Sequence, residues 1–157
     1  MKNNKYIRVL LFLIVNFLAL AIGVWLMQDG PRTNWYLSLQ KAPWTPANWV
    51  FGAAWSSIML CFSFYMAKLS FVYEFLDKKL LALFTVQWLL NVGWNYVFFN
   101  QHQTQVGLVV IVLLWLLIGY FTFEYIKNMK WYTLLILPYL VWMTIATSLN
   151  AYIVLNN

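Results

Sequence analysis

Long apolar stretches separated by short polar segments make up most of this chain. Each stretch approaches or reaches the ~20 residues that an α-helix needs to cross the hydrocarbon core of a bilayer. The pattern predicts five membrane-spanning helices, at about residues 7–27, 48–67, 80–99, 106–125 and 131–155. We therefore expect an all-α integral membrane protein, folded as a single five-helix domain over residues 1–157.

The break between the first and second stretches is long and rich in tryptophan and proline. Pro43 and Pro46 lack backbone donors and push their preceding residues out of the helical region, so no helix continues through residues 41–46. In a membrane protein, irregular backbone must lie in water, pack against protein or line a cavity. We expect a long loop that roofs a binding site, with a short helical turn at residues 35–40.

The third stretch is unusually polar for a membrane helix. Gln87, Asn91 and Asn95 follow one another at intervals of four, so they share one face, with Trp94 and Phe98 beside them. Amides are costly in lipid unless they are paired, so this face is expected to meet protein or a cavity. The alternative is that the amides only join helices to one another.

The fifth stretch contains Pro138, which is expected to kink the helix because proline removes a backbone hydrogen bond. After it, Trp142, Ala146 and Asn150 recur at intervals of four and share one side. A tryptophan beside a small alanine can form one wall of a flat slot.

Composition supports the membrane assignment, since 64% of the residues are hydrophobic and only 9% are charged. The net charge of +6 does not indicate a nucleic-acid partner, because the basic residues flank apolar stretches and do not line one polar face. With five spans, the side of the amino terminus carries Lys2, Lys5, Arg8, Lys68, Lys78, Lys79, Lys127 and Lys130. The other side carries Arg32 and Lys41, so the amino terminus is expected in the cytoplasm and the carboxyl terminus outside.

Familiar catalytic patterns are missing from the sequence: it has no Ser/His/Asp set, no metal-ligand spacing and no phosphate-binding glycine loop. His102 is expected to be a solvent-facing loop residue and not a haem ligand. All four carboxylates lie outside the apolar stretches or at their ends, which argues against a proton-coupled transporter. A wall of aromatic rings and amides remains, and it suits flat aromatic ligands.

Several motifs together resemble the TspO/MBR family, the tryptophan-rich sensory proteins and the mitochondrial translocator protein or peripheral benzodiazepine receptor. They are WYLSLQK at 35–41, PWTP at 43–46, WVFGAAW at 49–55, the polar face of the third stretch, and PYLVWMTIATSLN at 138–150. The resemblance implies a five-helix bundle, often dimeric, with a pocket closed by the first loop. Family members bind porphyrins, haem and benzodiazepine-type ligands and, in animals, cholesterol.

Matched position by position, the resemblance implies a set of ligand-binding residues in the loop and the pocket: Tyr36, Pro46, Trp55, Asn91, Trp94, Trp142 and Ala146. Trp55 and Trp142 match the tryptophans proposed in the family to support light-dependent porphyrin degradation. No metal and no cofactor is expected to be required; porphyrin or haem would be the ligand.

Two departures from the family limit the transfer. Ala42 and Ala47 stand where the family usually has proline, which predicts a less rigid loop. The cholesterol motif at the end of the fifth stretch is incomplete, because no Lys or Arg follows Tyr152. The resemblance therefore does not predict cholesterol binding.

The leading interpretation is a membrane receptor, sensor or carrier that binds porphyrins and benzodiazepine-type ligands, forms a homodimer and is not an enzyme. One alternative is a light-dependent porphyrin-degrading enzyme that uses Trp55 and Trp142. The other is a structural scaffold, which would be fully packed and leave no cavity of the ~300 Å³ or more that a ligand occupies.

Overall fold

The structure is a computed structural model that describes residues 4–75 and 77–157. Over these residues it is entirely helical, with seven α-helices and no strand. They are α1 (Lys5–Met27), α2 (Asn34–Ser38), α3 (Asn48–Val72), α4 (Lys78–Asn95), α5 (Thr104–Glu124), α6 (Ile126–Met129) and α7 (Leu137–Asn156). Short 3-10 helices occupy Gly30–Arg32 and Lys130–Leu135, and a π-helix occupies Tyr96–Asn100. Lys2, one of the charges used to predict orientation, lies outside the described residues.

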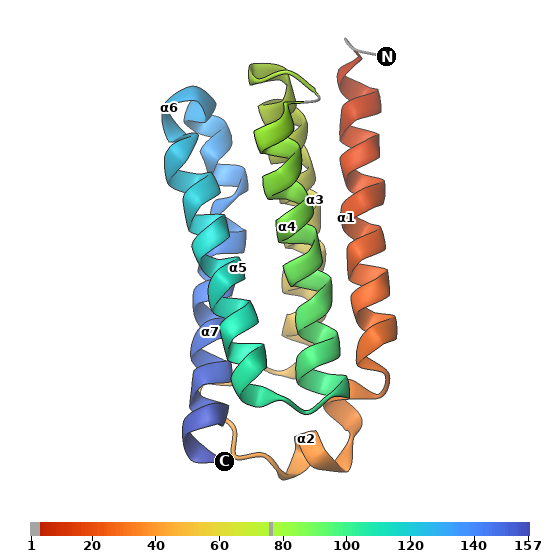
Figure 1. The fold of residues 1–157 in the computed structure, drawn as a ribbon, viewed down its shortest axis with the longest axis vertical. Coiled ribbons are helices and arrows are strands. Elements are labelled where there is room, and N and C mark those ends of the chain that lie inside the picture. Colours follow the sequence, from red (N-terminus) through yellow and green to blue (C-terminus); the bar gives the residue numbers. More distant parts are fainter. Residues whose placement is uncertain (1–3, 76) are drawn as a thin grey trace.

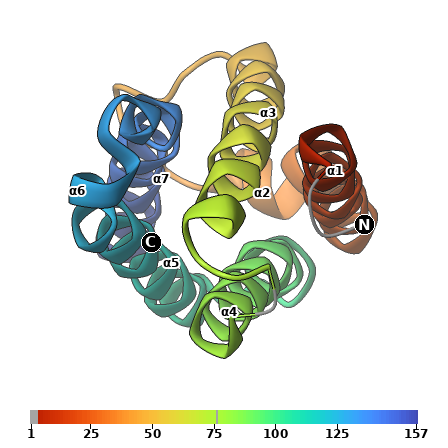
Figure 2. The ribbon, with the colours of Figure 1, turned by 90° about the horizontal axis from the view of Figure 1, so that it is seen from above.

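The five long helices form a closed ring when the bundle is viewed along its axis (Figure 2). In that ring α1 packs against α3 and α4, α5 packs against α4 and α7, and α3 packs against α7. The amino terminus and α6 lie at one end of the bundle, while α2 and the carboxyl terminus lie at the other (Figure 1). Helices far apart in sequence, such as α3 and α7, therefore share one interior.

Four helices within the described part of the chain are long and apolar enough to cross a membrane: α1 with its extension to Arg32, α3, α5 and α7. This is consistent with an integral membrane protein. Helix α4 does not reach the same hydropathy, because it begins with Lys78 and Lys79 and carries the amides of the polar face.

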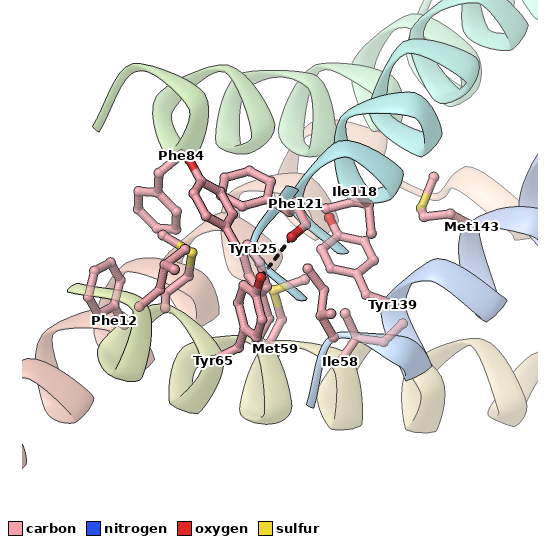
Figure 3. Close-up of a cluster of buried hydrophobic side chains, with 14 of the residues drawn as sticks. Phe12, Ile58, Met59, Tyr65, Phe84, Ile118, Phe121, Tyr125, Tyr139 and Met143 are labelled. Atoms are coloured by element: carbon pink, nitrogen blue, oxygen red, sulfur yellow. Dashed lines mark hydrogen bonds between the residues drawn. The ribbon is translucent and has the colours of Figure 1, made fainter. Parts of the chain in front are cut away.

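The half of the bundle near the amino terminus is packed with aromatic side chains (Figure 3). Phe12 meets Phe84 edge-on with ring centres 5.2 Å apart. The Tyr65 hydroxyl donates a hydrogen bond of 2.8 Å to the Phe121 carbonyl, which ties α3 to α5. Tyr139 from α7 is fully buried in the same cluster. Side chains fill the interior of this half of the bundle.

One feature of the predicted helices is wrong. Pro138 does not kink a helix: residues Lys130–Leu135 form a 3-10 helix and α7 begins at Leu137, so Pro138 lies in the first turn. There the missing backbone N–H costs nothing, since first-turn donors have no partner within the helix. The first connection, residues 28–47, includes helical structure. It contains the 3-10 helix Gly30–Arg32 and α2, which confirms the predicted helical turn.

Gly23 allows α1 to approach α4 closely. A Cβ at this position would lie 2.8 Å from the Asn95 side-chain nitrogen, which donates to the Asn91 carbonyl. We expect Gly23→Ala to lower the free energy of unfolding by about 1 kcal/mol, although alanine normally stabilises a helix relative to glycine. Gly119→Ala is the matched control, because a Cβ there has no atom within 4 Å. Unfolding by SDS titration measures both, and equal stability of the two variants would contradict the expectation.

Candidate functional site

A cavity of about 630 Å³ occupies the half of the bundle opposite the packed core. All five long helices contribute to its walls, and residues 28–47, which we call the lid, cover its outer end. Its volume lies within the range of roughly 300–1,000 Å³ that small-molecule sites span. The two ends of the bundle therefore differ: side chains fill the interior at one end, and the other end contains a cavity.

Six of the seven predicted ligand residues line this cavity: Tyr36, Trp55, Asn91, Trp94, Trp142 and Ala146. Pro46 does not line it, although its neighbour Thr45 does. The Thr45 backbone N–H donates to the Ala42 carbonyl at 2.9 Å, so the chain turns here before α3 begins at Asn48.

Three tryptophans from three different helices form the aromatic walls. Trp142 on α7 is 7% exposed and meets Phe51 edge-on at 5.4 Å. Trp55 on α3 meets Tyr139 edge-on at 6.0 Å, which anchors it to the packed half. Trp94 on α4 stacks on Phe98 at 5.1 Å with 14° between the rings. These contacts hold the indoles at the cavity surface, where a flat ligand would meet their faces or edges.

The indole N–H groups of Trp94 and Trp142 differ in their hydrogen bonding. The Trp94 indole N–H donates to the Asn150 side-chain oxygen at 3.0 Å, and the Asn150 amide donates to the Thr104 carbonyl at 3.2 Å. Trp94 is thus fixed by α7 and α5. The Trp142 indole nitrogen is buried and has no hydrogen-bond partner in the part of the chain that the structure describes. It is a donor that a ligand oxygen could satisfy.

The polar face of α4 divides between the two halves of the bundle. Asn91 and Asn95 line the cavity, and Asn95 donates to the Asn91 carbonyl at 3.1 Å. Gln87 is buried one turn earlier and donates to the Tyr139 hydroxyl at 2.9 Å. Both interpretations of the amides therefore hold, each at a different position: Gln87 joins helices, and Asn91 and Asn95 face the cavity.

A π-helix at Tyr96–Asn100 continues α4 and shapes the cavity near the lid. It places Phe98 and Phe99 in the cavity wall. Gly107 on α5 makes room for it, because a Cβ there would lie 3.1 Å from the Phe98 ring. Single π turns often occur at functional sites. The sequence carries no signal for the π turn itself; it places Phe98 beside the polar face of the third stretch, whereas Phe99 was not predicted to face a cavity.

The first part of the lid packs on this π-helix. The Thr33 side chain caps α2 by accepting from the Tyr36 backbone N–H at 3.3 Å. The Tyr36 ring then lies 5.3 Å from Phe99, and burial raises the pKa of the Tyr36 phenol, which keeps its hydroxyl neutral. Trp35 stacks on His102 at 4.0 Å, and that histidine is exposed and lies outside the cavity lining.

The second part of the lid is attached to the end of α7. The Gln40 backbone N–H donates to the Asn157 side-chain oxygen at 2.9 Å, and the Asn157 amide donates back to the Gln40 carbonyl at 3.2 Å. The Trp44 indole N–H donates to the Ser148 hydroxyl at 3.1 Å. These bonds close the lid over the cavity. That Ala42 and Ala47 loosen it stays a prediction.

Charged groups of the lid line the outer end of the cavity, a feature that the sequence analysis missed. They are Asp29, Arg32 and Lys41. The Lys41 ammonium lies 4.7 Å from the centre of the Tyr36 ring, and Arg32 is exposed. Two cations and one carboxylate leave this end of the cavity positive, whereas its inner walls are aromatic and apolar. The arrangement suits a ligand with a flat apolar body and an acidic edge.

Residues 11–155 match the TspO/MBR family. The chain is 36% identical to Protein CrtK of Rhodobacter capsulatus over 121 residues, which covers 74% of each chain. It is 32% identical to Tryptophan-rich protein TspO of Chlorobaculum tepidum over 149 residues, or 94% of each chain. It is also 30% identical to the human Translocator protein over 125 residues, covering 77% of this chain and 73% of the human one. The chain therefore belongs to the TspO/MBR family, as its motifs predict.

Proposed function

We propose that this protein is a membrane receptor or carrier that binds porphyrins, haem or benzodiazepine-type ligands in the cavity beneath the lid. The observation that supports the proposal most directly is the set of three tryptophans facing one cavity of about 630 Å³. Indoles offer large stacking faces to a flat ring system, and the unpaired Trp142 N–H offers a donor. Membership of the TspO/MBR family supports a sensor or receptor in a membrane.

The scaffold alternative predicts a fully packed bundle. A cavity of this volume argues against it, because close-packed interiors contain few voids larger than a water molecule. The enzyme alternative is favoured by one observation: Trp55 and Trp142 line the same cavity, so one bound tetrapyrrole could contact both. Light-dependent porphyrin degradation is therefore the second candidate function.

One experiment tests all three functions. Protoporphyrin is titrated into the purified protein, tryptophan fluorescence is followed, and the complex is then illuminated alongside Trp55→Phe and Trp142→Phe. Saturable quenching with no catalytic product supports the receptor. A new chromophore that accumulates over many turnovers only when both tryptophans are present supports the enzyme. Absence of saturable quenching contradicts both and leaves the scaffold.

The proposal includes a topology in which α4 spans the membrane together with the four more apolar helices, as part of a homodimer. Basic residues occupy the start of α1, the start of α4 and the region of α6. These segments lie at one end of the bundle (Figure 1), so this end would face the cytoplasm and the lid would lie outside. Single cysteines placed at Ser38 and at Asn128 in a Cys61→Ser background test the orientation. A membrane-impermeant thiol reagent added to intact cells should label Ser38→Cys and spare Asn128→Cys; the opposite result would invert the topology. Chemical cross-linking in membranes tests the dimer.

The positive outer end of the cavity leads to a prediction about ligand charge. Arg32→Gln is expected to weaken binding of protoporphyrin, whose propionates are acidic, by about fivefold, since an exposed ion pair contributes up to ~1 kcal/mol. Binding of the dimethyl ester should be unchanged. Lys127→Gln, which removes the same charge at the other end of the bundle, is the control. Equal losses for the acid and the ester would show that Arg32 acts through packing and not through charge.

A further inference from the structure

A second hollow lies on the outside of the bundle at the opposite end from the lid. It is a groove of about 560 Å³ formed by the end of α5, by α6 with the following 3-10 helix, and by the start of α7. It does not share a lining residue with the cavity beneath the lid. Figure 1 places α6 at the same end of the bundle as the amino terminus. The family resemblance assigned no residue to this groove.

The lining of the groove is apolar apart from one lysine and two threonines. Most of its lining is aliphatic or aromatic: Phe123, Ile126, Trp131, Leu134, Leu137 and Leu140. Trp131 is 83% exposed, as expected for a tryptophan at the membrane interface. Lys130 is the one charged lining residue in the described part of the chain, and Lys127 is exposed in the turn before it. Among the described residues, no carboxylate lines the groove to oppose this charge.

Two further observations point to an occupant. Thr133 lines the groove and is 7% exposed, and its hydroxyl has no hydrogen-bond partner within the described residues. Lys130 has φ 49° and ψ −122°, a backbone conformation that glycine adopts readily and other residues rarely do. A lysine therefore occupies a backbone conformation that favours glycine, and a buried hydroxyl belongs to the same lining. A ligand oxygen in the groove would satisfy both groups.

We infer that this groove is a binding site for one anionic glycerophospholipid, with an acyl chain along the apolar wall and the phosphate at Lys130. The Thr133 hydroxyl would donate to a phosphate or ester oxygen. Lipid tails and leucine side chains are equally apolar, so burial of the acyl chain adds little preference in a bilayer. Selectivity must then come from the headgroup. Basic pockets at the cytoplasmic ends of membrane helices attract acidic lipids for this reason.

The test compares phosphatidylglycerol with phosphatidylcholine of identical acyl chains, added to delipidated protein in mild detergent. Native mass spectrometry should detect one phosphatidylglycerol retained in preference to phosphatidylcholine. Lys130→Gln should reduce that preference about fivefold, since a lysine near an acidic headgroup contributes roughly a factor of five. Lys78→Gln, which removes an exposed charge at the same end but outside the groove, should leave it unchanged. Equal retention of the two lipids by the unmodified protein, or equal losses in both variants, would overturn the inference.

Two more variants separate binding from folding. Lys130→Gly removes the charge and relaxes the backbone, so it should raise the Tm without lipid and still lose the preference. Thr133→Val removes an unpaired hydroxyl at nearly constant volume, so it should keep the Tm and lose part of the phosphatidylglycerol retention. A Lys130→Gly protein that still prefers phosphatidylglycerol would exclude the lysine as the recognition group.

The place of binding is tested with brominated phosphatidylglycerol, which quenches nearby indoles. Quenching should fall in Trp131→Phe and remain in Trp55→Phe, whose indole faces the other cavity. If the Trp131→Phe protein is quenched as much as the unmodified protein, the lipid binds elsewhere and the inference fails. This result is independent of whether a porphyrin binds beneath the lid.

Discussion

Ala146→Phe is expected to lower the affinity for protoporphyrin about 100-fold or more. Ala146 lies one helical turn after Trp142 on α7, and both residues line the cavity. A phenylalanine ring at this position would occupy the space in front of the Trp142 indole. Overpacking of a defined interior typically costs up to ~3 kcal/mol, and each 1.4 kcal/mol corresponds to a factor of ten.

The control for this variant is Ala53→Phe, the same change at an exposed position of α3 outside the cavity lining. It should bind protoporphyrin as the unmodified protein does. Both affinities are measured by quenching of tryptophan fluorescence, after SDS titration has established that both variants are folded. A folded Ala146→Phe protein with unchanged affinity would place the ligand outside this cavity.

Phe62→Ala is expected to cause the largest loss of stability. The Phe62 side chain is fully buried, and its ring meets those of Phe121 and Tyr139 edge-on at 6.1 and 5.3 Å. In a soluble protein such a truncation costs about 3–5 kcal/mol, part of it from hydrophobic transfer. Here the unfolded chain stays in detergent or lipid, so we expect roughly 2–3 kcal/mol, carried mainly by lost packing.

Phe64→Ala provides the matched comparison, because Phe64 lies on the same helix and is 42% exposed. It should change the free energy of unfolding by ~0.5 kcal/mol or less. The difference between the two variants in SDS titration measures what close packing contributes without a hydrophobic driving force. Equal losses would mean that the packed half does not carry the stability of the bundle.

The sequence predicts the helices well where one physical signal dominates. Hydropathy alone identifies α1, α3, α5 and α7. Helix α4 was predicted from its apolar stretch at 80–99 as well, but its two lysines and its amides keep it below the hydropathy of the other four helices. The predicted kink at Pro138 is wrong because a proline in an apolar stretch is compatible either with a kink or with the start of a helix. Only the neighbouring 3-10 helix decides between them.

Part of the site was predicted because its residues recur at helical spacing. Trp142 and Ala146 share a helical face, so their spacing brings them to one wall. Asn95 could have been added, since it continues the spacing from Asn91. Helical spacing does not reach Arg32 and Lys41, because they lie on the lid, whose path depends on bonds to α7 over more than a hundred residues of chain. Tyr36, on the same lid, was predicted only through the family resemblance. Phe99 joins the cavity wall through a π turn that has no sequence signature.

The lid is attached to α7 by residues outside the cavity lining, so the rates of ligand binding and the affinity depend on different residues. A ligand that enters past the lid must wait for the Trp44–Ser148 and Gln40–Asn157 bonds to break, and none of these four residues lines the cavity. We call these two contacts the lid latch. Weakening it, for example with Ser148→Ala, would accelerate ligand association and dissociation together and leave the dissociation constant nearly unchanged. At high ligand concentration the association rate would reach a plateau equal to the rate of lid opening. Substitutions at the lid latch could therefore change the residence time of the ligand without changing which ligands the cavity binds.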